Sequence, residues 1–66
     1  MIYLIEIYVE KNVQPLEFKW SGESIEEKIR DIIVYGYTYY VGGLYVVIPP
    51  HRIHEVRFFE EDNANT

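Results

Sequence analysis

The chain has 66 residues and a formal net charge of −5, from six basic and eleven acidic side chains. This length is enough for one small domain, and such a domain buries only about 60% of the surface that its unfolded chain exposes. Cysteine is absent, which excludes disulfides and thiolate metal sites. The acidic balance disfavours binding to phosphate backbones. Hydrophobic residues make up 48% of the chain, which indicates a folded protein.

The sequence shows no sign of a membrane or secretory segment. No apolar run approaches the roughly 20 residues that a membrane-spanning helix needs. The N-terminal segment MIYLIEIYVEK lacks the basic start and small-residue cleavage site of a secretory signal. We therefore expect a cytoplasmic protein with no membrane partner.

Residues 1–10 and 13–20 both alternate between apolar and polar side chains, which predicts two antiparallel strands. A tight turn at Lys11 and Asn12 would join them, with Asn12 in the positive-φ conformation. Pro15 favours an edge position for the second strand. This turn places the apolar residues of both strands on one face, by three pairings: Tyr3 with Trp20, Ile5 with Phe18, and Ile7 with Leu16.

Residues 24–36 carry the pattern of an amphipathic helix. Ser24 and Glu27 have the spacing of a capping box, and Gly36 is placed to end the helix in a left-handed conformation. Four isoleucines recur at helical spacing and predict one buried stripe. These are Ile25, Ile29, Ile32 and Ile33.

Residues 37–48 predict a second hairpin with its turn at Gly42 and Gly43. The pairing that this turn dictates puts six apolar residues on the face that the helix is expected to cover: Tyr37, Tyr39, Val41, Leu44, Val46 and Ile48. The other face carries Thr38, Tyr40, Tyr45 and Val47. Tyr40 lies directly opposite Tyr45 in this register.

Residues 53–59 alternate again and predict a fifth strand after the prolines at 49 and 50. With a simple four-residue loop at 49–52, Val56 and Phe58 would join the uncovered face. With a bulge at the prolines they would move into the core, and both arrangements stay open. The order ββαβββ predicts an α+β fold: one antiparallel sheet of about five strands with one helix packed across it. Residues 1–60 would form this single domain, and the polar tail 61–66 is expected to fray.

A single helix can cover one face of such a sheet, so the other face is predicted to stay exposed unless the sheet curls into a barrel. An exposed apolar patch of this kind marks an interaction site, and tyrosine suits such a surface. Dimerisation through it would also add stability to a small domain. The predicted interaction surface consists of Tyr8, Tyr40, Tyr45, Val47 and His54.

No constellation of catalytic residues is recognisable, and no enzyme activity or cofactor is expected. His51 and His54 are the best candidates for a metal site. A strand would direct them to opposite faces, and zinc needs three or four convergent ligands. We therefore expect no metal.

The leading functional hypothesis is a small acidic protein-interaction module that forms a homodimer or docks on a protein partner. A specific version is a protein of a virus or mobile element whose carboxylates occupy a nucleic-acid-binding groove of a host protein. Those carboxylates would be Glu23, Glu26, Glu27, Asp31, Glu60, Glu61 and Asp62.

Two alternatives come from other classes of protein. In the first, Tyr40, Tyr45 and Phe58 would stack on the bases of single-stranded nucleic acid. Only a few cations could assist them: Lys19, Arg52 and Arg57. In the second, the chain would be an assembly subunit that grows by repeated pairing of sheet edges.

Overall fold

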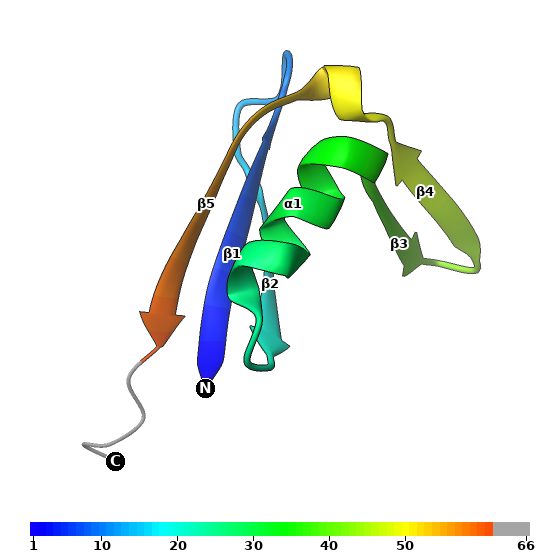
Figure 1. The fold of residues 1–66 in the computed structure, drawn as a ribbon. Helices are drawn as coiled ribbons and strands as arrows, with labels where there is room; N and C mark the ends of the chain where they lie inside the picture. The colour runs from blue at the N-terminus through cyan, green and yellow to red at the C-terminus, as the bar shows by residue number, and fades with distance from the viewer. Residues whose placement is uncertain (62–66) are drawn as a thin grey trace.

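A computed structural model describes residues 1–61, which contain one α-helix and five β-strands (Figure 1). The elements, in chain order, are β1 (Ile2–Val9), β2 (Leu16–Ser21), α1 (Ile25–Tyr35), β3 (Tyr37–Val41), β4 (Leu44–Ile48), the 3-10 turn η1 (Pro50–Arg52) and β5 (Ile53–Glu61). A three-stranded antiparallel sheet has the order β2-β1-β5, and β3 and β4 form a separate hairpin. The predicted α+β class is confirmed, with the strands divided between two sheets.

The pairing of β1 with β2 follows the predicted register, in which Ile5 faces Phe18 and Ile7 faces Leu16. The turn differs in detail, because the N–H of Asn12 donates to the carbonyl oxygen of Val9 at 3.0 Å. Lys11, with φ 73°, is therefore the residue in the positive-φ conformation, and the prediction for Asn12 is wrong. β2 is an edge strand of its sheet, as predicted.

Strand β5 pairs with β1 and not with β4, because η1 turns the chain back toward the free edge of β1 (Figure 1). Ile53 and Glu55 pair with consecutive residues of β1, which leaves His54 as the extra residue of a β-bulge. The extra residue reverses which side chains of β5 face the core beyond this point. Val56 therefore packs against the core, whereas Phe58 lies on the same face but is 43% exposed. The bulge lies at His54 in the pairing with β1, and not at the prolines, so the predicted position of the bulge and the predicted burial of Phe58 are wrong.

The core lies between α1 and the three-stranded sheet. Five side chains are buried among the described residues: Ile5, Ile7, Ile25, Ile32 and Ile48. Ile29 packs against them, but Ile33 is 54% exposed and its predicted burial is wrong. Ile33 lies at the margin of the helix stripe, where it lines an open hollow with Pro50 and Ile53.

The helix begins and ends where the sequence predicts, but the interactions at its two ends differ from those predicted. Ser24 is the N-cap, but its side chain makes no capping hydrogen bond, so the predicted capping box is wrong. At the other end, the N–H of Gly36 donates to the carbonyl oxygen of Ile32 at 2.8 Å. Gly36 has φ 86° and ψ −170°, a positive φ outside the left-handed helical region. A Cβ there would collide with the carbonyl oxygen of Ile48, so this glycine lets the helix end approach β4.

The second hairpin has the predicted register and turn, with positive φ at both Gly42 and Gly43. It diverges from the three-stranded sheet (Figure 1). The expectation that the helix covers its inner face is wrong for Val41 and Leu44, which are largely exposed, because α1 packs over β1 and β5. Of the predicted tail, Glu61 belongs to β5, and residues 62–66 lie outside the described range.

Candidate interaction surface

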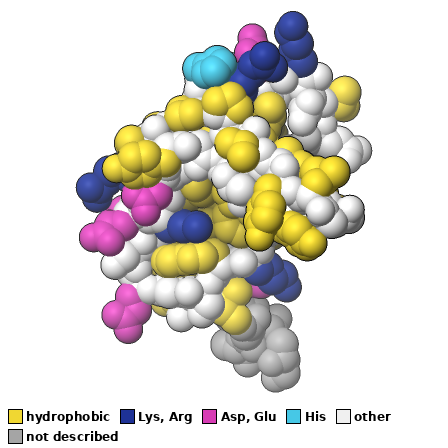
Figure 2. Space-filling model, turned by 90° about the vertical axis from the view of Figure 1, so that its right-hand side faces the viewer, with side chains coloured by type: hydrophobic (Ala, Val, Ile, Leu, Met, Phe, Trp, Pro, Cys, Tyr) yellow, Lys and Arg dark blue, Asp and Glu magenta, His cyan; other side chains and the backbone are white. Residues whose placement is uncertain are grey.

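The β3–β4 hairpin has no charged side chain between residues 37 and 48, in a chain with seventeen charged residues (six basic plus eleven acidic). Its exposed apolar side chains are Tyr40 (62% exposed), Val41 (54%), Leu44 (56%), Tyr45 (73%) and Val47 (64%). Figure 2, which views the molecule from the hairpin side, shows hydrophobic side chains spread over this face. Tyr40, Tyr45 and Val47 lie on one face of the hairpin, and Val41 and Leu44 lie on its opposite face beside the Gly-Gly turn. We call these five residues together the hairpin surface.

The structure brings together three of the residues that the sequence predicts for an interaction surface. Tyr40 and Tyr45 are cross-strand partners, and their ring centroids lie 4.9 Å apart at an interplanar angle of 60°. This edge-to-face geometry suits the aromatic quadrupole and stabilises each ring against the other. Val47 follows Tyr45 on the same face of β4. The predicted face of the hairpin is therefore formed and exposed.

The opposite face of the hairpin attaches it to the body of the protein. The Tyr37 ring stacks between Phe18 of β2, with centroids 4.8 Å apart, and Tyr39, with centroids 5.9 Å apart. Burial, with a smaller contribution from Tyr39, raises the pKa of Tyr37. A hollow of about 360 Å³ separates β2 from β3, and Glu17 is the charged residue in its lining.

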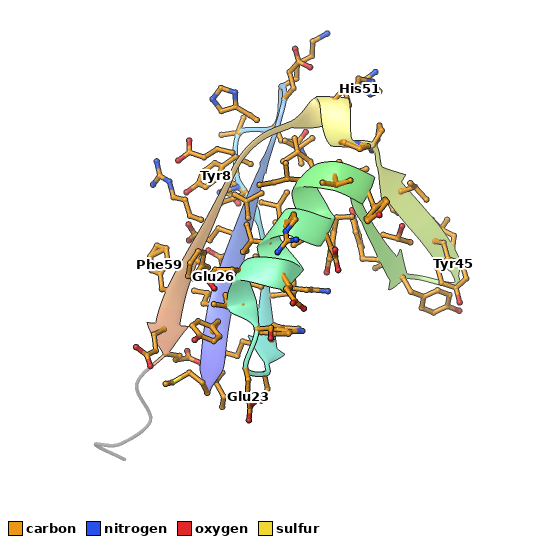
Figure 3. The ribbon with its side chains drawn as sticks, in the orientation of Figure 1. Tyr8, Glu23, Glu26, Tyr45, His51 and Phe59 are labelled. Atoms are coloured by element: carbon orange, nitrogen blue, oxygen red, sulfur yellow. The ribbon has the colours of Figure 1, made fainter. Side chains whose placement is uncertain are left out.

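Tyr8 lies far from the hairpin, on the face of the three-stranded sheet that α1 does not cover (Figure 3). Its hydroxyl donates to Glu6 Oε1 at 3.0 Å, and the Arg57 guanidinium lies 4.9 Å from its ring. Arg57 Nε donates to Glu55 Oε2 at 2.6 Å. The hydrogen bond to Glu6 is the main cause that raises the pKa of Tyr8, and the bond from Arg57 lowers the pKa of Glu55. Tyr8 thus belongs to a polar cluster of its own.

His54 also lies away from the hairpin surface. It is exposed at the bulge of β5, and it lines a small hollow with Ile33 and Val56. His51, in η1, lines an open hollow of about 250 Å³ together with His54 and Glu10, and it also lines a second hollow that reaches Val47 at the end of β4. Figure 3 shows His51 at the end of the molecule where η1 joins β4 to β5. Within residues 1–61, no group of three or more histidine or carboxylate side chains is arranged to hold a metal ion.

The side chains considered for nucleic-acid stacking do not share one surface. Phe58 packs edge-on against Tyr3 of β1, with ring centroids 6.1 Å apart, whereas Tyr40 and Tyr45 lie on the hairpin. Two of the three cations are engaged with carboxylates, because Lys19 Nζ lies 3.3 Å from Glu61 Oε1 and Arg57 pairs with Glu55.

The carboxylates of the helix region all point toward solvent. Glu23 precedes α1, at the lower end of the molecule in Figure 3, and Glu26 lies in the first turn of the helix. Glu27 and Asp31 are also exposed. They lie on a different element from the hairpin surface.

Val41 and Leu44 are the members of the hairpin surface that sequence reasoning missed. Both flank the Gly-Gly turn, at the end of the hairpin that lies farthest from the body (Figure 1). A signal for them was present in the sequence. A stripe of four isoleucines on one helix is too narrow to cover the apolar faces of two hairpins.

Comparison of the chain with models of protein families, with curated proteins and with solved structures finds no match. Within the described range, no helix combines the length and the hydropathy needed to cross a membrane.

Proposed function

We propose that this chain is a small, acidic, non-enzymatic protein-interaction module that associates with a second copy of itself through the hairpin surface. The observation that carries the proposal is the exposure of five apolar side chains on a hairpin without charge. Contiguous apolar patches of a few hundred Å² in soluble proteins mark sites of interaction. Tyrosine supplies such sites with a large contact area at a low entropic cost.

Charge favours the hairpin as the meeting point of two copies. Each copy has a net charge of −5, so most orientations of approach bring like charges together. The hairpin is the segment where two identical surfaces can meet without opposing carboxylates, because residues 37–48 contain none. The contact also removes part of the tyrosine and valine side chains from water, which provides the driving force.

The available area is consistent with a weak pair. The three members of the hairpin surface that share one face, Tyr40, Tyr45 and Val47, expose roughly 400 Å² per copy. Two copies that met through this face would bury about 800 Å², the size of a weak or transient interface. A hairpin of two strands is marginal by itself, and the described core contains only five buried side chains. Association therefore adds stability where the fold has least.

Analytical ultracentrifugation of a Tyr40→Ser, Tyr45→Ser double variant tests the proposal. We expect the wild-type chain to dimerise in a concentration-dependent way and the double variant to lose at least about 2 kcal/mol of association free energy. Tyr35→Ser is the matched control, because Tyr35 is 76% exposed but lies at the end of α1, outside the hairpin surface.

Far-UV circular dichroism establishes that each variant is folded. A wild-type chain that stays monomeric up to about 1 mM, the weak end of specific association, overturns the proposed function. Equal dissociation of the control and the double variant would place the interface elsewhere.

A further inference from the structure

We infer that the second copy adds to the free edge of β4, in an antiparallel register centred on Val46, so that the two hairpins form one four-stranded sheet. The inference rests on the proposed function and specifies its contact. Strand addition of this kind supplies backbone hydrogen bonds for affinity and alternate side chains for specificity.

The outer edges of the three-stranded sheet are protected against strand addition. Pro15 precedes β2, and Glu17 and Lys19 follow within it. β5 carries Glu55 and Arg57 along its length. Proline and charged side chains are the devices by which natural proteins block edge pairing. β3 and β4 contain neither, and prolines 49 and 50 limit the β4 edge only beyond Ile48. The hairpin edges are therefore the charge-free edges of the described fold.

Between the two hairpin edges, β4 is the accessible one. β3 faces the body, where the hollow between it and β2 is lined by Phe18, Tyr37 and the carboxylate-bearing Glu17. A strand that entered there would desolvate Glu17 without a partner for its charge, which is costly. β4 lies on the outer side of the hairpin (Figure 1), and it contains no charged residue.

The hairpin geometry determines which backbone groups of β4 are free. In a hairpin with a two-residue loop, Val41 and Leu44 form the hydrogen-bonded pair next to the turn, and bonded and non-bonded pairs then alternate. Tyr45 and Val47 therefore belong to non-bonded pairs, and their N–H and C=O groups point away from β3. Farther along the chain, Pro49 has no N–H to donate.

A two-fold axis at Val46 brings all four free groups, the N–H and C=O of Tyr45 and of Val47, into hydrogen bonds with the second copy. Tyr45 of each copy pairs with Val47 of the other, and each pairing exchanges two backbone hydrogen bonds. On one face of the new sheet, Tyr45 of each copy then lies beside Val47 of the other, so both side chains lose exposed surface where the two β4 strands meet, and Tyr40 supports Tyr45 from the outer strand. Because each copy uses the same edge, the contact is isologous and closes as a dimer, without open-ended growth.

Proline substitutions at one cross-strand pair separate the two hairpin edges. Val47 and Thr38 are partners in a non-bonded pair, so Val47→Pro removes an outward N–H from β4 and Thr38→Pro removes one from β3. Proline is tolerated at edge positions whose N–H faces solvent. We expect Val47→Pro to raise the dissociation constant of the dimer more than about tenfold. Thr38→Pro is expected to stay within about twofold of wild type.

Cysteine cross-linking tests the register without altering the backbone. The chain has no cysteine, so a single introduced thiol can form only an intermolecular disulfide. In the proposed register, Val46 faces Val46 of the second copy in a non-bonded pair with Cα atoms about 4.5 Å apart, within disulfide range. Val47→Cys is the matched control, because residue 47 faces residue 45 across the axis. We expect Val46→Cys to oxidise to a covalent dimer at least about tenfold faster.

The outcomes distinguish this inference from the proposed function. A wild-type monomer refutes the proposed function itself. If the wild type dimerises but Thr38→Pro weakens the dimer as much as Val47→Pro, the β4 edge is overturned and the hairpin surface remains. Equal oxidation rates of the two cysteine variants overturn the register, and this result does not depend on whether the proline variants fold.

Discussion

Tyr8 and Tyr45 show how differently the two sheets treat an aromatic side chain that faces outward. On the three-stranded sheet, the Tyr8 hydroxyl donates to Glu6, and its ring lies under Arg57. On the hairpin, Tyr45 is 73% exposed and contacts another exposed tyrosine, Tyr40. Charged neighbours keep the first surface compatible with water, whereas the second surface has none. The second surface is the one that we propose to meet a second copy.

The two sheets also differ in how they are anchored. The three-stranded sheet and α1 bury Ile5 and Ile7 completely, so this part of the protein holds most of the core. The hairpin is held at its base, by the Tyr37 stack on Phe18 and by the close approach of Gly36 to Ile48. Stability is therefore concentrated in the first sheet, and substitutions in the two sheets are expected to have unequal effects.

The largest effect is expected for Ile5→Ala, at a fully buried position of β1. Loss of a buried isoleucine side chain and the resulting cavity cost about 2–5 kcal/mol. A domain of this length has only roughly 3–10 kcal/mol of total stability. Urea unfolding followed by the fluorescence of Trp20 measures the change.

Leu44→Ala on the hairpin is the matched comparison, because Leu44 is 56% exposed. At a concentration where the chain is monomeric, we expect it to change the unfolding free energy by less than about 0.5 kcal/mol. Similar losses for both variants would contradict the unequal distribution of stability between the sheets.

The local features of the fold could be predicted from the sequence. Alternation and turn residues gave the strands, the register of both hairpins and the span of the helix, because these depend on neighbours close in the chain. The partner of β5 could not be predicted in the same way. It depends on the direction that η1 imposes on the chain and on the bulge at His54, and neither has a periodic signal.

Part of the candidate surface could also be predicted, because it depends on neighbours close in the chain. Tyr40, Tyr45 and Val47 share a face by strand alternation alone, and the structure places them together. Tyr8 and His54 were grouped with them on the assumption of one continuous sheet. Division of the strands into two sheets separates them, and this division depends on long-range packing of α1 over β1 and β5.

A substitution at Gly36, where the end of α1 meets β4 of the hairpin, is expected to have an intermediate effect on the free energy of unfolding. Gly36→Ala forces an alanine to adopt a positive φ and places its Cβ against the carbonyl oxygen of Ile48. We expect a loss of about 1–3 kcal/mol in the free energy of unfolding. Gly43→Ala is the control, because its φ is also positive but a Cβ there meets open space. If both variants lose the same stability, the contact between helix end and β4 adds nothing to the backbone strain.

The smallest effect on the free energy of unfolding is expected for a substitution at Tyr8, and this effect depends on pH. The hydrogen bond to Glu6 is the largest of the influences that raise the pKa of Tyr8, and Arg57 opposes them. A group whose pKa is higher in the folded state stabilises the fold while it is protonated. The contribution is therefore complete below the pKa of tyrosine in the unfolded chain, about 10, and is lost as pH rises through the folded-state pKa.

Tyr8→Phe removes this contribution. We expect wild type to exceed the variant in unfolding free energy by a constant, small amount near neutral pH, and this excess to disappear in alkaline solution. Urea unfolding at a series of pH values measures the difference. Glu6→Gln keeps an acceptor oxygen without its charge, so it should lower the pKa of Tyr8 in an absorbance titration of the tyrosines. An excess that stays constant through the alkaline range would show that the hydrogen bond from the protonated Tyr8 hydroxyl to Glu6 is not its source. The contrast with Tyr45 would then rest on exposure alone.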